Sequence, residues 1–372
     1  MPPSQVEPIG VFVCGDVMTG RGIDQILPHP APPVLYESYV RDAREYVHLA
    51  ERASGPIPRP VDFTYIWGDA LEVLDQAATD ARIVNLETSI TSSEEAWPGK
   101  GIHYRMHPQN IGCLTAARID CCCLANNHVL DWGYAGLRET LQTLDGAGIA
   151  HAGAGASAAE AAAPAALELP SKGRVLVFSM GTTTSGIPWE WRATGDRPGV
   201  FLLEDLSEQT ARRVAGLVRE AKRPGDVAIA SIHWGPNWGY EVPDEQVRFA
   251  HRLIDEGVDL VHGHSSHHVK PIEVYQDRLI LYGCGDLLDD YEGIGGYEAF
   301  RPDLRLLYLV WIDPKQSRLV DARLVPMQVQ RFQLHRATET DARWLCTLLS
   351  RLGAPFGTRV RLERDHSLAL QW

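Results

Sequence analysis

The chain has 372 residues, 45% of them hydrophobic and 22% charged, so it is long enough to bury a sizeable core as one large domain or two ordinary ones. This composition excludes disordered and fibrous proteins. The formal net charge of -13 argues against a nucleic acid as the main partner, because the sequence shows no basic face that would neutralise phosphates.

The amino terminus and the cysteines give an expectation about location. Residues 1–8 contain no basic residue and no apolar run, so we expect neither a signal peptide nor a membrane anchor. Of the seven cysteines, three are consecutive at 121–123 inside an apolar stretch, which is unlike a disulfide framework. We therefore expect buried thiols and a cytoplasmic protein that does not contact a membrane.

Short apolar runs recur along the chain, and each run ends in a polar cluster. They cover residues 11–14, 83–84, 121–125, 227–232, 258–261 and 279–282. Between several of them apolar residues repeat with helical spacing, for instance over 137–144 and 247–254. Alternating strands and helices predict an α/β fold, in which ligands bind outside the carboxyl ends of the strands.

After about residue 300 the pattern changes to strands without intervening helices. Residues 306–312 and 318–329 predict an antiparallel hairpin, and a helix is expected to start near Thr338. Its apolar face would pack on the body and comprises Ala342, Leu345, Leu348, Leu349 and Leu352. We predict a catalytic domain over 1–330 and a packed helical extension over 331–372.

The residues that follow the apolar runs have the oxygen and nitrogen donors that metal ions need. They are Asp16, Glu87, Asn127, His128, His233, His264 and His267, which a parallel sheet would bring to one edge. Taken singly, an Asp or Asn after a strand is often only a helix cap or a turn former. The set as a whole favours a metal site.

The motifs that contain these residues resemble those of a known family. They are Gly15-Asp16-Val17-Met18, Asn85-Leu86-Glu87-Thr88, the segment from Ala125 to Gly133, His233-Trp234-Gly235, the segment from Gly263 to His267, and Pro271-Ile272-Glu273-Val274-Tyr275. In this order, over roughly residues 9 to 292, the chain resembles the CapA family, whose fold is that of the calcineurin-like metallophosphoesterases. Each motif alone is weak, and the ordered set carries the resemblance.

The resemblance implies a four-layer α-β-β-α metallophosphoesterase-like sandwich with one or two divalent metal ions. Asp16 and His267 would hold one ion. Asn127, His233 and His264 would hold the other, with Glu87 bridging and His128 acting as an acid or base. Manganese, iron, zinc and calcium are not distinguished by this donor set.

The chain departs from the family pattern at several positions. Met18 stands where a phosphoesterase has a histidine, so one metal site has lost a nitrogen donor. Asp286 stands where the family usually has an asparagine, which adds a carboxylate that is either a base or a ligand. His262 and His268 have no counterpart in the pattern, and we assign them no role.

Three functions compete at this point. The family that the chain resembles includes metal-dependent peptide epimerases, notably for lasso-peptide precursors. The favoured function is therefore epimerisation of a peptide residue, with metal-stabilised charge and His128 and Asp286 as the two bases. The alternative is a phosphoesterase or a hydrolase of a peptide or of poly-γ-glutamate. A non-enzymatic role in capsule export is disfavoured by the absence of an anchor.

Aromatic residues and two loops are the candidates for contacting a peptide substrate. The loops are residues 95–110 and 181–199, and the aromatic candidates are Trp132, Trp189, Trp191, Trp234, Trp238 and Tyr240. For these loops an ordinary surface role is an equal alternative, and core packing is expected for about half of the aromatic residues.

Overall fold

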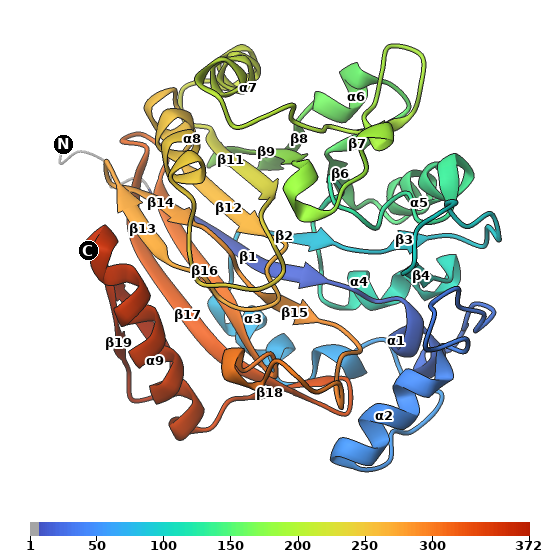
Figure 1. The fold of residues 1–372 in the computed structure, drawn as a ribbon. Coiled ribbons are helices and arrows are strands. Elements are labelled where there is room, and N and C mark those ends of the chain that lie inside the picture. The colour runs from blue at the N-terminus through green and yellow to red at the C-terminus, as the bar shows by residue number, and fades with distance from the viewer. Residues whose placement is uncertain (1–6) are drawn as a thin grey trace.

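The structure is a computed structural model, which describes residues 7–372 and contains two large β-sheets (Figure 1). The larger sheet follows the path β19 (Arg359–Leu362), β20 (Leu368–Gln371), β17 (Arg318–Gln330), β16 (Leu304–Asp313), β1 (Ile9–Val17), β2 (Ala81–Leu86), β5 (Cys121–Cys123) and β6 (Ala150–Ala152). Two short strands pair with this path, β15 (Asp286–Leu288) with β1 and β18 (Gln333–Arg336) with β17.

The second sheet contains six strands in the order β13 (Ile272–Tyr275), β14 (Arg278–Leu281), β12 (Leu260–His264), β11 (Val227–His233), β9 (Gly173–Gly181) and β8 (Ala165–Leu169). Two small pairs lie outside these sheets, β3 (Ser89–Ile90) with β4 (Arg105–Met106) and β7 (Ala154–Gly155) with β10 (Gly199–Val200). In each large sheet the strands that precede the candidate metal ligands run parallel to one another.

Helices cover the outer face of each large sheet. On the larger sheet these are α1 (Arg21–Ile26), α2 (Arg44–Ser54), α3 (Ala70–Ala77), α4 (Gly112–Ala116) and α5 (Gly133–Gly146). On the second sheet they are α7 (Glu208–Ala221) and α8 (Asp244–Asp255), while α6 (Ala158–Ala162) packs on β7. Helix, sheet, sheet and helix layers confirm the predicted four-layer α/β sandwich.

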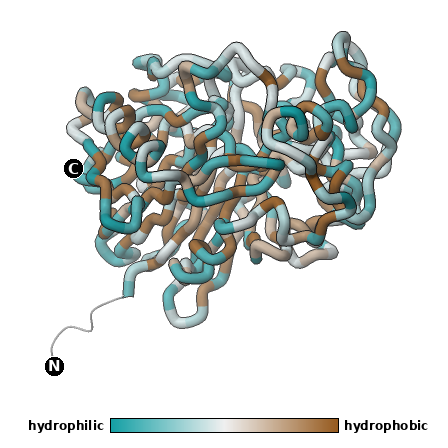
Figure 2. The backbone as a smooth tube through the Cα atoms, turned by 90° about the horizontal axis from the view of Figure 1, so that it is seen from below, coloured by the Kyte–Doolittle hydropathy of each residue, from teal (hydrophilic) through white to brown (hydrophobic). Residues whose placement is uncertain are grey.

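Strand β1 shows why these runs are continuously apolar. Phe12 and Cys14 face the helices, whereas Val11 and Val13 lie between the two sheets, so both faces of the strand are buried. The hydrophobic residues accordingly concentrate on the interior strands in Figure 2.

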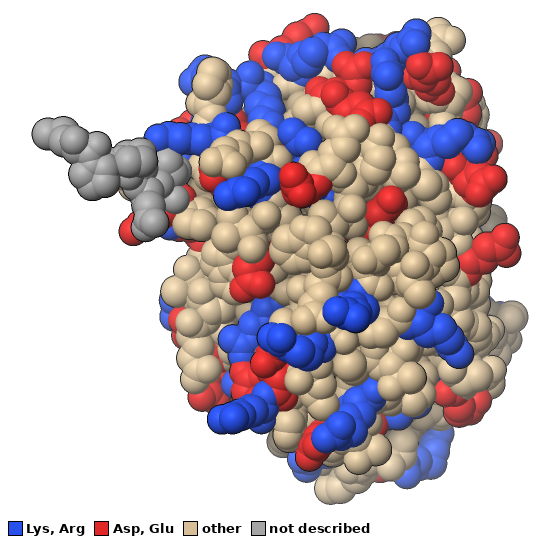
Figure 3. All heavy atoms as spheres, turned by 90° about the vertical axis from the view of Figure 1, so that its left-hand side faces the viewer, with Lys and Arg blue, Asp and Glu red and all other residues tan. Residues whose placement is uncertain are grey.

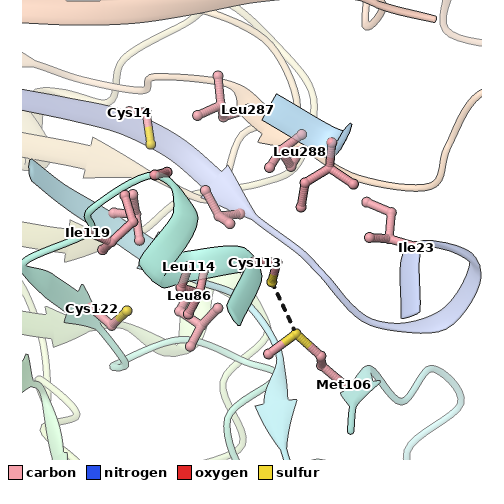
Figure 4. Packing of buried hydrophobic residues seen from close by; sticks show 14 of the residues in the cluster. Cys14, Ile23, Leu86, Met106, Cys113, Leu114, Ile119, Cys122, Leu287 and Leu288 are labelled. Carbon is pink, nitrogen blue, oxygen red and sulfur yellow. Dashed lines mark hydrogen bonds between the residues drawn. The ribbon is translucent and has the colours of Figure 1, made fainter. Parts of the chain in front are cut away.

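The cysteine triplet has the same two-faced burial, and the expectation of core thiols is confirmed. Cys122 packs in the helix-side cluster, part of which Figure 4 shows, while Cys121 and Cys123 lie between the sheets. In the same cluster the Cys113 thiol lies 3.5 Å from the sulfur of Met106 (Figure 4). All seven cysteines lie within residues 7–372, and none of them forms a disulfide there.

The carboxyl-terminal segment contains the expected helix, α9 (Glu339–Gly353), whose N-cap Thr338 accepts a hydrogen bond from the Asp341 amide. Its leucines pack at the inter-sheet cluster. The same segment also contributes β18, β19 and β20 to the larger sheet, so it is more than a helix. The division at residue 330 stays a prediction.

Residues 1–6 lie outside the described part of the chain, so the expectation about the leader is a prediction there. Within residues 7–372 no helix combines the length and the apolar composition that a membrane crossing requires. Figure 3 shows acidic and basic side chains interspersed on one face of the molecule. Ion pairs such as that of Arg323 with Asp365 occur near the carboxyl end.

Candidate metal centre

The candidate site lies where the carboxyl ends of strands from both sheets meet. Asp16 lies near the end of β1 in the larger sheet, and Glu87 directly follows β2. His233 and His264 are the last residues of β11 and β12 in the second sheet, and they are direct neighbours in the register of that pair. We expected one sheet edge, but the donors come from two sheets that face each other.

The first group of donors consists of Asp16, His233 and His264, all buried. His233 Nδ1 lies 2.8 Å from His264 Nδ1, and these nitrogens lie 4.0 and 3.7 Å from Asp16 Oδ1. A point equidistant from the three atoms lies about 2.1 Å from each, which is the length of a bond from a metal ion to nitrogen or oxygen.

The second group consists of Asp16, His267 and Asp286, and it is also buried. His267 Nδ1 lies 3.0 Å from Asp286 Oδ1, and Asp286 sits beside Asp16 because β15 pairs with β1. Among the described residues, Asp16 is therefore the carboxylate that both groups share. The resemblance had assigned this bridging role to Glu87. Asp286 lies among these donors, which favours its interpretation as a metal ligand over its interpretation as a base.

Glu87 and Asn127 extend the donor set on the other side of His233. His233 Nε2 lies 3.0 Å from Asn127 Oδ1 and 3.7 Å from Glu87 Oε1. His233 thus presents one ring nitrogen to the Asp16 group and the other to these two oxygens. All six residues predicted as ligands are brought together, while their individual roles stay predictions.

The charges of this cluster fit a cation. Burial, and next the charge of Asp286, raise the pKa of Asp16 to about 8, and burial and Asp16 raise the pKa of Glu87. Asp286 Oδ2 is buried and has no hydrogen-bond partner within residues 7–372. Crowded buried carboxylates of this kind need positive charge to be stable, and a divalent ion among nitrogen and oxygen donors supplies it.

His128 lies beside the donors in a separate hydrogen-bonded group. Its Nδ1 lies 2.6 Å from Asp131 Oδ2 and 3.1 Å from Lys100 Nζ, and its Nε2 lies 4.0 Å from Glu87. The Tyr104 ring stacks on the imidazole with centroids 3.8 Å apart. Burial, and next the charge of Lys100, lower the pKa of His128, so the ring is neutral at pH 7.

The contact with Asp131 determines which nitrogen of His128 carries the proton. The carboxylate can only accept, and this is the shorter contact, so Nδ1 donates to Asp131 and Nε2 keeps its lone pair. Asp131 and Lys100 are partners of His128 that were not predicted from the sequence. The signal for Asp131 was its spacing of three residues from His128 inside a quoted motif, and Lys100 lay in a candidate substrate loop.

A cavity of about 800 Å³ opens above the donors. Glu87, Asn127, His128, His233 and His267 line its floor, whereas Asp16, His264 and Asp286 are not among its lining residues. Its walls include Arg21, Lys100, Gly101, Ile102, Tyr104, Trp238, Tyr291 and Arg305. The loop at 95–110 therefore reaches the cavity, and none of the described lining residues comes from 181–199.

Most of the candidate aromatic residues do not face this cavity. Trp132, Trp191 and Trp234 are buried core residues, and Trp189 is exposed elsewhere. Trp238 lines the cavity, where it stacks on Tyr297 with ring centroids 3.9 Å apart. The expectation that about half pack in the core agrees with this arrangement.

The four-layer sandwich with mixed nitrogen and oxygen donors at its strand ends defines an α/β protein with a candidate metal centre. The chain belongs to the bacterial capsule synthesis protein PGA_cap family, whose family model matches residues 10–291. This membership confirms the CapA resemblance that the motifs indicated.

The chain is similar to two relatives and, far more weakly, to one solved structure. A probable polyglutamine synthesis accessory protein of Mycobacterium tuberculosis is 52% identical over 361 residues, which cover 97% of this chain and 95% of that protein. The PGA biosynthesis protein CapA of Bacillus subtilis is 26% identical over 285 residues, or 74% of this chain and 62% of that protein. The crystal structure of TT1561 of Thermus thermophilus covers 84% of this chain and 97% of that chain at 10% identity, but its TM-score of 0.37 is too low to bear on fold or function.

Proposed function

We propose that this chain is a metal-dependent enzyme that hydrolyses amide bonds in a polymer or peptide built from glutamate or glutamine. The names of the relatives, a polyglutamine synthesis accessory protein and a PGA biosynthesis protein, support this substrate class. Membership of the family supports a CapA-type role in making or trimming such a polymer. The unpaired cysteines support a reducing location such as the cytoplasm.

The observation that carries the proposal is a neutral histidine that lines one cavity beside two donor groups, which reach that cavity through His233 and His267. Asp16, His233, His264, His267 and Asp286 would hold the ion, with Glu87 and Asn127 beside them. When bound, a divalent ion polarises a carbonyl and makes water more acidic. Imidazole donors favour manganese, iron or zinc over calcium, which prefers oxygen ligands.

His128 has the properties that proton transfer in amide hydrolysis requires. His128 lines the cavity, and its free Nε2 can take a proton from the attacking water as the new carbon–oxygen bond forms. The same nitrogen then returns that proton to the leaving nitrogen as the carbon–nitrogen bond breaks. Asp131 and Tyr104 hold the ring in place during both transfers.

A direct test uses the protein loaded with manganese and three substrates: poly-γ-glutamate, a glutamine-rich peptide, and a simple phosphate ester. Chain length is measured by mass spectrometry, with a chelated sample as control. We expect new amino termini in at least one amide substrate only when metal is present. Cleavage of the phosphate ester with both amide substrates intact would overturn the proposal in favour of a phosphoesterase.

Epimerisation at a peptide α-carbon is the second candidate, and the neutral Nε2 of His128 favours it because such a nitrogen is a base. The predicted second base, Asp286, lies beneath the floor and does not line the cavity, so it is poorly placed to reach a substrate. Incubation in deuterated water separates the two reactions. Deuterium at one α-carbon without cleavage would mark an epimerase, and cleavage would mark a hydrolase.

A further inference from the structure

A continuous chain of hydrogen bonds runs behind the candidate ligand His264, away from the cavity. His264 Nε2 lies 2.8 Å from Ser231 Oγ, and Ser231 Oγ lies 3.1 Å from His262 Nδ1. His262 Nε2 in turn lies 2.6 Å from the backbone carbonyl oxygen of Cys14. These side chains are completely buried, and no part of the proposed reaction uses Ser231 or His262.

The far end of this chain determines the direction of every bond in it. A carbonyl oxygen can only accept, so His262 Nε2 must donate to Cys14. A neutral His262 then has a lone pair on Nδ1, which accepts the hydroxyl proton of Ser231. The Ser231 oxygen is left to accept from His264 Nε2, which places the proton of His264 on that nitrogen. The opposite nitrogen, Nδ1, therefore keeps its lone pair, which faces His233 Nδ1 at 2.8 Å and Asp16 Oδ1 at 3.7 Å.

We propose that Ser231 and His262 are positioning residues that hold His264 in the tautomer able to bind a metal ion through Nδ1. This inference rests on the metal centre of the proposed function, but not on which bond is cleaved. An outer hydrogen bond of this kind orients a histidine ligand and raises its basicity. Ser231 contacts both histidines, and His262 contacts the carbonyl of Cys14. Together these three hydrogen bonds are compatible with only one neutral tautomer of His264, the one protonated on Nε2.

The same chain of bonds connects the two sheets at the metal centre. Ser231 lies on β11 and His262 on β12, both in the second sheet, whereas Cys14 lies on β1 of the larger sheet. Cys14 is two residues before Asp16, and His262 is two residues before His264. The bond from His262 to Cys14 therefore holds the strand that carries Asp16 against the strand that carries His264.

One competing arrangement reverses the direction of the chain. The Cys123 thiol also lies beside His262 and Ser231. If His262 were doubly protonated and paired with a Cys123 thiolate, Ser231 would accept from His262 and donate to His264, which would then carry its proton on Nδ1. Two charges in this dry interior would lose their hydration, so we favour the neutral arrangement.

Nitrogen NMR of the metal-free protein labelled with ¹⁵N-histidine separates the two arrangements without any assay of activity. We expect His264 to carry its proton on Nε2 and His262 to be neutral with its proton on Nε2. A proton on His264 Nδ1, or two protons on His262, would overturn the proposal. The result does not depend on whether amide hydrolysis is the reaction.

Variants test the consequence for metal binding, measured by titration calorimetry with Mn²⁺. His262→Phe and Ser231→Ala should each weaken Mn²⁺ binding by about 10- to 100-fold, the usual effect of removing such a partner. His262→Gln should restore most of the affinity, because glutamine has an oxygen to accept from Ser231 and an N–H group to donate to Cys14. A purely structural role would not distinguish His262→Gln from His262→Phe in this way.

Ser179→Ala is the matched control. Ser179 is equally buried, is the register neighbour of Ser231 on β9, and accepts from the Ala125 amide rather than contacting a histidine. We expect its Mn²⁺ affinity to equal that of the unmodified chain. Unchanged affinity in His262→Phe, or equal losses in His262→Phe and His262→Gln, would refute the role of the chain of bonds. If His262→Phe does not fold, the NMR assignment still decides the matter.

Discussion

Replacing Asp131 by asparagine is the sharpest test of how His128 works. Both carboxylate oxygens of Asp131 receive only donors, from His128 Nδ1, the Tyr104 amide and the Lys100 ammonium. An asparagine side chain has one oxygen and one NH₂ group, so in either orientation a donor faces a donor. The least costly adjustment moves the His128 proton from Nδ1 to Nε2, where it blocks the lone pair.

The expected size of the effect follows from that adjustment. A positioned general base contributes about 10²- to 10⁴-fold to a rate, so Asp131→Asn should lower kcat by about that factor. Metal content should not change, because Asp131 belongs to neither donor group. Unfolding should become easier by about 1–3 kcal/mol, the cost of leaving a buried polar group without a suitable partner.

The assay compares turnover of the polymer cleaved by the unmodified protein with metal content from elemental analysis. Glu139→Gln is the control, since Glu139 also accepts from several donors, at Thr91 and Ser92, but lies outside the cavity. Its turnover should be unchanged. A kcat for Asp131→Asn close to that of the unmodified protein, with metal retained, would refute the role given to this carboxylate.

Four further predictions concern the metal, the ligands and the fold. Chelation should abolish turnover and lower the unfolding temperature without unfolding the protein at 25 °C, and full turnover in chelator would exclude a metal from the reaction. His264→Ala should lose metal and turnover together, whereas His128→Ala should lose turnover alone; an empty site in His128→Ala would make that residue a ligand. Burial raises the pKa of Asp24 from 3.8 to about 6, so the folded protein binds the proton of this carboxyl group more tightly than the unfolded chain does. The resulting contribution of Asp24 to the free energy of unfolding is full below pH 3.8. It is lost as the pH rises to 6, by up to about 1.4 kcal/mol per pH unit. Urea unfolding of Asp24→Asn should lack that slope, and identical slopes in the two proteins would contradict the assignment. Leu349→Ala, at a side chain 2% exposed on α9, should lower the free energy of unfolding by about 2–5 kcal/mol, and a negligible change would mean that the carboxyl-terminal helix unfolds separately.

The sequence alone determined the features that depend on neighbouring residues. Continuous apolar runs predicted strands buried on both faces, as in β1, because such a strand has no polar side to expose. The cap at Thr338 and the leucine spacing after it predicted α9 for an equally local reason. The donors after each run were found because parallel strands place their carboxyl ends together, and the family motifs added the expected grouping.

Tertiary structure alone decided how those strand ends combine, because contacts between sheets join residues that are far apart in the chain. Asp16 is the shared carboxylate because β15 brings Asp286 back beside it from the far end of the family-matched segment, which no local pattern shows. His262 was unassigned in the sequence, and it has a role only because the carbonyl of Cys14 in the other sheet fixes its proton. The sequence specifies which side chains follow each strand, whereas the packing of two twisted sheets determines which of these side chains come into contact.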